Sequence, residues 1–375
     1  MTKRPRVLLL IPHLGGGGAE QVTALLTRGL SAQKYELHLG LVTESEMASD
    51  LVPSTVRIHA LGASRVRFAA FRLWRLVRKL EPDLILSGMA HLNFLVLLLR
   101  PLFPNKTRVI VRQNATVSAE LQSRRLPVYT RIFYRFVYPG ADRIVCQTSA
   151  MAADLAVRSN LGKRQVEVLP NPVDAVAIRA TCAPSEDYWG GPGPCLLAMG
   201  RLSFEKGFDL LLEAFASLRL KFPAAELTIL GTGPELDRLK GLRKELRLGH
   251  SVRFAGYVQH PERFFSGASL FVLPSRQEGM PNALLEAATG GLPIVALPAA
   301  DGVVNLLTGK QGAWLGAEVS SRALTRALLA ALDSIHPGQR FPHPWVDRFR
   351  MEFAIQDYER MIDEMLEKHI LREHA

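Results

Sequence analysis

Short apolar runs alternate with amphipathic stretches along most of this chain, and the alternation occurs twice. Strands separated by helices imply right-handed βαβ units and a parallel sheet. In the first half we expect strands at residues 7–12, 37–43, 56–60, 83–87, 108–112 and 143–147, with helices at about 19–30, 67–80 and 91–100.

The alternation of expected strands and helices begins again after two segments rich in Pro and Gly, at residues 169–174 and 189–194. The second half predicts strands at residues 196–199, 226–230, 252–255, 270–273 and 293–296, and helices at 209–221, 235–246 and about 345–371. Two α/β modules in tandem would place a cleft between the carboxyl ends of two sheets. We therefore predict a first domain at 1–172, a second at 173–345 and a C-terminal helix at 346–375 that packs across both.

Composition favours a folded chain with more than one core. The 375 residues exceed what one ordinary core holds, and 48% of them are hydrophobic and 22% charged. Cys146, Cys182 and Cys195 form no CxxC pair, so we expect reduced structural thiols and a cytoplasmic protein. The apolar run at 7–11 is read as a strand rather than a secretion signal, and the run at 94–99 is too short to span a bilayer.

A net charge of +11 suggests an anionic partner. Basic residues interleave with apolar and aromatic ones in two stretches, whose cations are Arg65, Arg67, Arg72, Arg75, Arg78 and Lys79 in the first and Arg124, Arg125, Arg131 and Arg135 in the second. Basic amphipathic helices with aromatics are typical of membrane-surface binding, here at the inner face of the cytoplasmic membrane. The alternative is two ordinary surface helices with solvated arginines. No stacking motif or zinc module indicates a nucleic-acid partner.

Two glutamates bracket the most informative local motif, Glu278-Gly-Met-Pro-Asn-x3-Glu286. It follows a short buried strand, and its helix is expected to start at Pro281. Free backbone N–H groups at a helix start can bind an anion or a polyol, and the glutamates can accept hydrogen bonds from hydroxyl groups.

Three other loops follow expected strands. The loop Leu14-Gly-Gly-Gly-Gly-Ala-Glu20 could bring its backbone close to an anionic ligand, or be a merely tight turn. Arg201 and Lys206 could converge as a diphosphate clamp, or be a solvated pair beside Glu205. The loops at 231–234 and 256–258 could admit a nucleoside, or be ordinary turns.

Together these motifs resemble glycosyltransferase family 4. The resemblance rests on Gly17-Gly18-Ala19-Glu20, on Gly200-Arg201-Leu202 with Lys206-Gly207, on the Glu278–Glu286 motif, and on residues 168–174 as an interdomain segment. It covers nearly the whole chain. It implies the GT-B fold, in which two Rossmann-like domains face each other across a cleft, and a retaining, nucleotide-sugar-dependent transferase.

The resemblance also implies residue roles. Arg201 and Lys206 would bind the donor diphosphate, and Glu278 would face the donor sugar. The nucleotide-binding residues implied are Gly18, Arg201, Lys206, Gly231, Tyr257, Val258 and Glu286, with Glu286 on the ribose. The donor-sugar residues implied are Glu278, Gly279, Met280, Pro281, Asn282 and Ala283. No metal or other cofactor is implied, because Arg and Lys neutralise the diphosphate.

Two departures from the family pattern concern the acceptor side and a later loop. Where many relatives place a histidine, this chain has Gln113 and Asn114, and His13 and His91 are further candidates near strand ends. Residues 301–309 are a degenerate acidic loop to which we assign no role. The implied mechanism is front-face attack by a hydroxyl of a saccharide or lipid-linked saccharide. A sugar-nucleotide epimerase on the same fold is the alternative.

Overall fold

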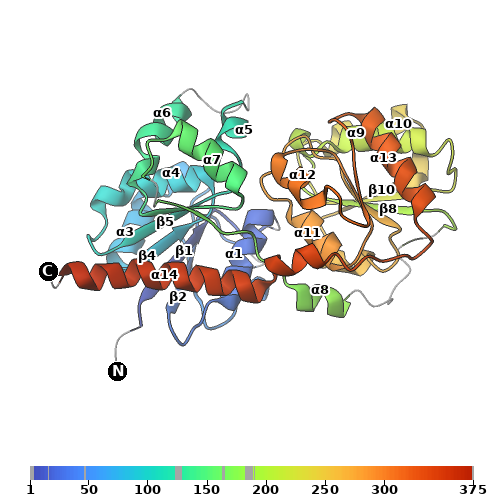
Figure 1. Cartoon of the computed structure of the whole chain (residues 1–375). Coiled ribbons are helices and arrows are strands. Elements are labelled where there is room, and N and C mark those ends of the chain that lie inside the picture. Colours follow the sequence, from blue (N-terminus) through green and yellow to red (C-terminus); the bar gives the residue numbers. More distant parts are fainter. Residues whose placement is uncertain are drawn as a thin grey trace. The chain divides into compact units, whose positions relative to one another are not determined.

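The computed structural model describes residues 4–15, 17–45, 48–122, 129–162, 165–181, 189 and 191–373. Gly16, Arg124, Arg125 and Cys182, which figure in the predictions above, lie outside these residues. The chain divides into two compact units, which are described separately (Figure 1). The first comprises Met1–Pro172 and Met351–Ala375, and the second comprises Val173–Arg350.

The first unit contains a fully parallel seven-stranded sheet in the order β3-β2-β1-β4-β5-β6-β7. Its strands are β1 (Arg6–Ile11), β2 (Glu36–Leu41), β3 (Arg57–Ala60), β4 (Leu84–Ser87), β5 (Arg108–Gln113), β6 (Arg143–Cys146) and β7 (Val166–Val168). The apolar runs predicted six of these strands, and the structure confirms them. The strand β7 was not predicted.

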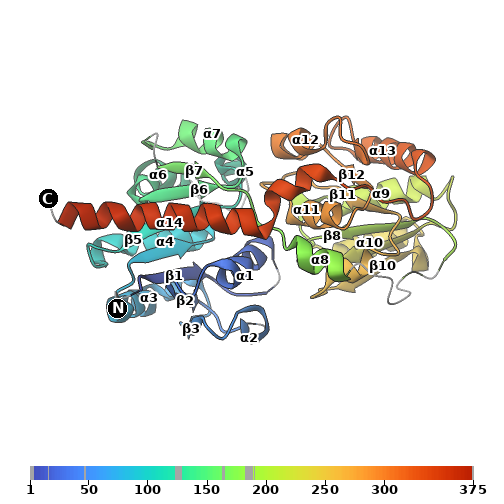
Figure 2. The same cartoon turned by 60° about the horizontal axis from the view of Figure 1, so that its bottom comes forward.

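Helices cover both faces of this sheet (Figure 2). They are α1 (Gly18–Gly29), α2 (Ala48–Leu51), α3 (Ala70–Leu80), α4 (Ala90–Leu99), α5 (Val117–Gln122), α6 (Tyr129–Phe136), α7 (Ser149–Arg158) and α14 (Met351–Glu373). Alternate side chains of a strand point to opposite faces. Leu9 therefore packs with α1 and α14, whereas Leu8 packs with α3, α4, α6 and α7.

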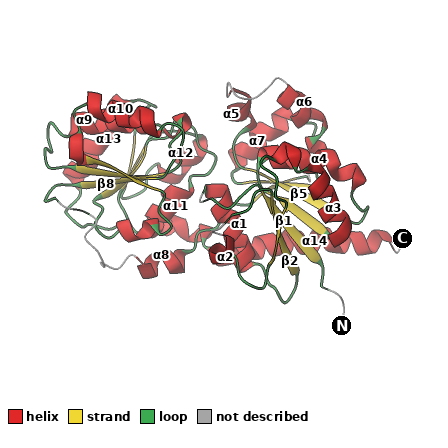
Figure 3. Cartoon of the chain, turned by 180° about the vertical axis from the view of Figure 1, so that it is seen from behind, coloured by secondary structure: helices red, strands yellow, loops and turns green. Residues whose placement is uncertain are grey.

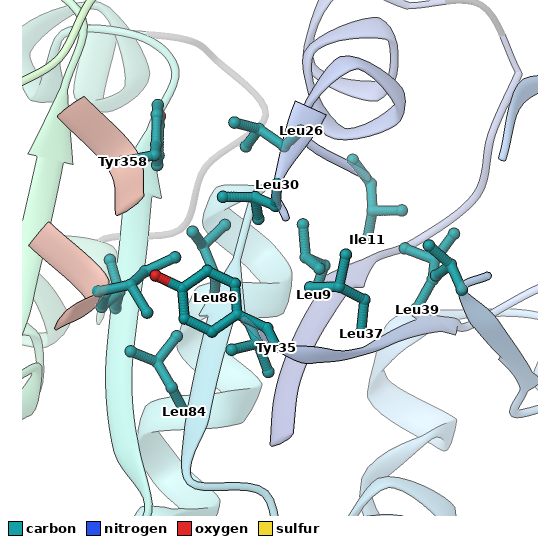
Figure 4. Close-up of a cluster of buried hydrophobic side chains, with 14 of the residues drawn as sticks. Leu9, Ile11, Leu26, Leu30, Tyr35, Leu37, Leu39, Leu84, Leu86 and Tyr358 are labelled. Carbon is teal, nitrogen blue, oxygen red and sulfur yellow. The ribbon is translucent and has the colours of Figure 1, made fainter. Parts of the chain in front are cut away.

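The C-terminal helix α14 completes the first unit. Figure 4 shows Tyr358 beside the cluster formed by Leu84, Leu86 and Tyr35, and Tyr358 is fully buried. This helix begins at Met351, not at residue 345 as predicted. Residues Pro344–Phe349 form a 3-10 turn that belongs to the second unit, and the chain then becomes extended at Arg350.

The second unit contains a parallel six-stranded sheet in the order β10-β9-β8-β11-β12-β13. Its strands are β8 (Cys195–Met199), β9 (Glu226–Leu230), β10 (Val252–Gly256), β11 (Leu270–Leu273), β12 (Ile294–Ala296) and β13 (Ala313–Leu315). Its helices are α8 (Ala175–Thr181), α9 (Phe208–Leu218), α10 (Leu236–Glu245), α11 (Asn282–Thr289), α12 (Asp301–Leu307) and α13 (Ser321–Ser334). Helices again lie on both faces of the sheet (Figure 3).

Each sheet has one point where the strand order reverses direction. In the first sheet it lies between β1 and β4, and in the second between β8 and β11. Ligands of open α/β sheets bind outside the carboxyl ends of the strands at such points. The glycine-rich loop at 14–20 follows β1, and the loops carrying Lys206 and Glu278 follow β8 and β11.

Two further findings concern cysteines and membrane spans. Cys146 and Cys195 are free and buried, and burial raises the pKa of the Cys195 thiol to about 11. Within the described ranges, no helix combines the length and the hydropathy needed to cross a bilayer.

Candidate functional site

An ion pair between Lys206 and Glu278 joins the loops that follow β8 and β11. The Lys206 Nζ atom lies 2.8 Å from Oε1 and 2.9 Å from Oε2 of Glu278. The Ser275 hydroxyl donates a further hydrogen bond of 2.6 Å to Oε1. The Glu278 side chain is only 4% exposed, whereas that of Lys206 is 28% exposed. The carboxylate is therefore buried and fixed, while the ammonium group remains open to a ligand on one side.

The local fold places Lys206 at the end of a 3-10 turn, Phe204–Lys206, just before Gly207. Gly207 has φ +65°, in the left-handed region that favours glycine. A Cβ atom at this position would lie 2.1 Å from the Pro274 carbonyl oxygen. The absence of a side chain thus lets the two loops approach closely enough for Lys206 to reach Glu278.

The loops after β8, β9 and β10 are linked by backbone hydrogen bonds. The Gly231 amide donates to the Gly256 carbonyl at 2.6 Å, and the Leu202 amide donates to the Thr232 carbonyl at 2.9 Å. Gly231 has φ +132°, and a Cβ atom there would lie 2.0 Å from the Gly200 carbonyl oxygen. The structure thus brings Gly231 against the loop that carries the predicted diphosphate cations.

The other predicted nucleotide-binding residues lie around these loops. Arg201 is exposed, and Tyr257 is 41% exposed just after β10. Val258 packs partly against the core on the α11 side of the sheet. Glu286 is buried on α11, eight residues after Glu278 along the chain.

The start of α11 lies four residues after Glu278 along the chain. The helix begins at Asn282 with Pro281 as its N-cap, one residue later than predicted, and its first internal bond runs from the Leu284 amide to the Pro281 carbonyl. The amides of Asn282 and Ala283 precede that bond, so they point out of the N-terminus, where the helix dipole favours negative charge. Gly279 and Met280 lie half-buried immediately before it.

In the first unit, the glycine-rich loop is organised by Glu20. Its Oε2 atom accepts hydrogen bonds from the Gly15 amide at 2.6 Å and the Gly17 amide at 2.9 Å. Its Oε1 atom lies 3.1 Å from Nδ1 of His13. Burial alone would raise the pKa of Glu20, but the hydrogen bonds from His13, Gly17 and Gly15 outweigh it and lower the pKa. Two backbone amides of the loop that was expected to approach an anionic ligand are therefore hydrogen-bonded to this carboxylate.

Glu20 is part of the glycine-rich motif identified from the sequence, but no role was predicted for it. The available signal was the spacing, because a glutamate three residues after the N-cap forms one half of a capping box. Gly18, which was expected to approach the phosphate, is the first residue of α1.

The histidine candidates His13 and His91 follow adjacent strands of the first sheet. His91 is the second residue of α4, which follows β4, and His13 follows the adjacent strand β1. Desolvation by the surrounding protein is the larger cause that lowers the pKa of His91, and the positive charge of His13 is the second. The two imidazoles thus share one edge of the sheet.

Gln113 and Asn114 occupy different environments. Asn114 bridges two strand ends, because its Nδ2 donates to the Gly88 carbonyl at 2.8 Å and its Oδ1 accepts from Gln147 at 3.0 Å. Gln113 is 1% exposed, and its side chain hydrogen-bonds to Tyr134, Tyr138, Glu120 and the Ala115 carbonyl. Of the two alternatives, only Asn114 remains accessible at the edge of the sheet, since Gln113 belongs to a buried polar network.

Among the residues that the structure describes, no group of three or more His, Cys, Asp or Glu side chains is arranged to hold a metal ion.

Comparisons with known proteins match both halves of the chain. Residues 16–176 match the family model described as Glycosyltransferase Family 4, and residues 189–340 match the model described as Glycosyl transferases group 1.

Two curated relatives carry informative names. A Campylobacter jejuni protein, N-acetylgalactosamine-N,N'-diacetylbacillosaminyl-diphospho-undecaprenol 4-alpha-N-acetylgalactosaminyltransferase, is 29% identical over 290 residues, which are 74% of this chain and 76% of the relative. A Rhizobium meliloti protein, lipopolysaccharide core biosynthesis glycosyltransferase LpsE, is 33% identical over 168 residues, which are 44% of this chain and 46% of the relative.

A solved structure shares the fold. HepE from Anabaena, in complex with UDP and glucose, superposes with a TM-score of 0.81 at 15% identity, covering 96% of this chain and all of that one.

Proposed function

This chain belongs to glycosyltransferase family 4, and on that premise we propose that it transfers a sugar, with retention of anomeric configuration, from a nucleoside diphosphate sugar to a hydroxyl group. The acceptor is a saccharide or lipid-linked saccharide of bacterial envelope polysaccharide or glycolipid synthesis. The names of the Campylobacter and Rhizobium relatives, which specify a diphospho-undecaprenol acceptor and lipopolysaccharide core synthesis, support this acceptor class.

The observation that carries the proposal is the Lys206–Glu278 pair at the strand-order reversal of the second sheet. A buried carboxylate holds an ammonium group whose open side can meet phosphate oxygens. Arg201 on the same loop is exposed and supplies a second cation.

In the proposed reaction, the bond between the anomeric carbon and the diphosphate oxygen breaks as the acceptor hydroxyl forms a bond on the same face. The departing diphosphate oxygen accepts the proton of that hydroxyl. Lys206 and Arg201 stabilise the negative charge that grows on the diphosphate, so the step requires no metal ion. Glu278 orients the donor sugar, and Glu286 binds the ribose hydroxyls.

A sugar-nucleotide epimerase is not favoured. The curated relatives described above are both named as transferases. Consumption of a donor sugar that requires an acceptor distinguishes the transferase from an epimerase, which would convert the donor alone.

Nucleotide binding provides the first test. Thermal unfolding should be measured with UDP, GDP and ADP, beginning with UDP because the Anabaena structure contains it. A ligand that binds only the folded chain stabilises it by mass action, by about 2.7 kcal/mol at a concentration of 100 Kd, and so raises its melting temperature. We expect one of the three to raise the melting temperature, and its sugar conjugate to be consumed only with a saccharide acceptor. Failure of all three to stabilise the chain would contradict the proposal.

We further propose that the first unit docks on an anionic membrane through the face formed by α3, α4 and α6. Four large side chains on these helices and on the 3-10 turn before α3 (Val66–Phe68) are strongly exposed, namely Phe68 at 59%, Phe71 at 66%, Ile132 at 59% and Phe136 at 65%. Exposed cations lie on the same elements, namely Arg67, Arg75, Arg78, Lys79, Arg131 and Arg135. Helix α4 contacts α3, and Phe94 of α4 stacks on Phe133 of α6 at 3.9 Å between ring centroids. Apolar residues surrounded by cations fit an anionic lipid surface.

Vesicle binding tests this membrane proposal. We expect the wild-type chain to sediment with vesicles rich in phosphatidylglycerol at low salt, and a Phe71→Ser/Phe136→Ser variant to bind about tenfold more weakly, because each aromatic side chain contributes apolar area. Leu220→Ser is the control, since Leu220 is 88% exposed in the second unit. Equal binding of both variants, or equal binding to uncharged vesicles, would refute the proposed face.

A further inference from the structure

A second ion pair links the loop after β11 to the start of α9, a short distance along the chain from Glu278 and Lys206. Arg276 donates from its two terminal nitrogens to the two carboxylate oxygens of Asp209, at 2.7 and 2.9 Å. Asp209 lies in the first turn of α9, and Arg276 lies in the loop after β11. This paired geometry is the strongest form of an arginine–carboxylate interaction.

The Arg276 side chain also covers the turn that carries Lys206. Its guanidinium carbon lies 4.2 Å from the centroid of the Phe204 ring, and one nitrogen donates to the Phe204 carbonyl at 3.0 Å. Backbone hydrogen bonds also connect this loop to the turn. The amides of Arg276 and Gln277 both donate to the Glu205 carbonyl, at 2.8 and 3.2 Å. Arg276 therefore contacts each residue of the turn that precedes Lys206.

The partial burial of Arg276 and Asp209 favours a persistent ion pair over an occasional surface contact. The side chains of Arg276 and Asp209 are 20% and 13% exposed. Burial acts to raise the pKa of Asp209, but the hydrogen bond and charge of Arg276 outweigh it and lower the pKa. Arg238 of α10 approaches the same carboxylate at 3.4 Å, so Asp209 is held from two sides.

From this arrangement we infer that Arg276 and Asp209 are positioning residues for the donor diphosphate, and that they act through Lys206. The inference rests on the proposed function, because it assumes that Lys206 contacts the diphosphate. Held by Arg276, the turn Phe204–Lys206 presents the ammonium group at one fixed distance from Glu278. Without Arg276, the turn has to be ordered when the ligand binds, which weakens binding.

A double-mutant cycle with Lys206 tests whether the pair acts through that residue. Binding of the nucleoside diphosphate that stabilises the wild-type chain, among UDP, GDP and ADP, is measured by calorimetry for Arg276→Met, Lys206→Met and the double variant. We expect Arg276→Met to raise the Kd about tenfold and Lys206→Met to raise it about a hundredfold. In the Lys206→Met background, Arg276→Met should change the Kd less than about twofold.

Two variants separate geometry from charge. Arg276→Lys keeps the charge but loses the planar fork, so it should bind the nucleotide about as weakly as Arg276→Met. The exchange Arg276→Asp/Asp209→Arg should bind more tightly than either single substitution. Lys221→Met is the matched control, because Lys221 pairs with Asp333 at 2.6 Å beyond the opposite end of α9, and it should leave the Kd unchanged.

The outcomes are distinct. Independent effects of Arg276→Met and Lys206→Met, whose fold-changes multiply, would overturn the inference while leaving the proposed function standing. A Kd for Arg276→Met equal to that of Lys221→Met would overturn it as well. If no nucleoside diphosphate binds the wild-type chain, the proposed function fails and the inference fails with it.

Discussion

Replacing Lys206 by methionine is expected to lower kcat/KM for sugar transfer by about a hundred- to a thousandfold, the range seen when one donor to a developing negative charge is removed. Methionine retains most of the hydrocarbon length of lysine but cannot donate a hydrogen bond or carry charge. The open side of the Lys206 ammonium group is the part of the pair available to phosphate oxygens, since the other side faces Glu278.

The same substitution should also reduce stability, and this effect has to be separated from catalysis. Without Lys206, the carboxylate of Glu278 stays buried, with the Ser275 hydroxyl still donating a hydrogen bond to it. Leaving a buried group incompletely paired costs on the order of 1–3 kcal/mol. The double variant Lys206→Met/Glu278→Gln removes the charge as well, so we expect it to recover thermal stability but not transfer. Recovery of transfer in the double variant, or near-normal kcat/KM for Lys206→Met, would exclude the assigned role.

The fold was largely predictable because most of its strands contain a run of apolar residues. The strands β9 (Glu226–Leu230) and β11 (Leu270–Leu273) begin and end at the predicted residues. The strands β7 (Val166–Val168) and β13 (Ala313–Leu315) are the last strands on their edges and only three residues long. Their sequences carry no clear strand signal, and they depend on pairing with β6 and β12, which are distant constraints that local propensity does not contain.

The structure brings some of the predicted site residues together, but the contacts between them could not be predicted from the sequence. Lys206 and Glu278 were each assigned to the donor site, yet they are 72 residues apart and their ion pair depends on which strands are neighbours. The burial of Gln113 likewise depends on Tyr134 and Tyr138, which come from later in the chain. Residues 301–309, expected to be a loop, largely form helix α12.

The close approach of the two loops leads to the second prediction, that Gly207→Ala destabilises the chain by about 3 kcal/mol or more. Two costs add. An alanine in the left-handed region costs about 1 kcal/mol, and the new Cβ atom would lie 2.1 Å from the Pro274 carbonyl oxygen, so backbone has to move. That movement separates the turn carrying Lys206 from the loop carrying Glu278. A displacement of this kind should reduce transfer about a hundredfold.

Gly309→Ala isolates the first cost from the second. Gly309 has φ +69°, close to the +65° of Gly207, but a Cβ atom there would meet no atom within 4 Å. We expect it to lose only about 1 kcal/mol, with unchanged transfer. Urea unfolding of both variants beside the wild-type chain measures the difference, which reports the contact with Pro274 alone. Equal losses in the two variants would mean that the loops after β8 and β11 are not in close contact, and the basis for pairing Lys206 with Glu278 would be lost.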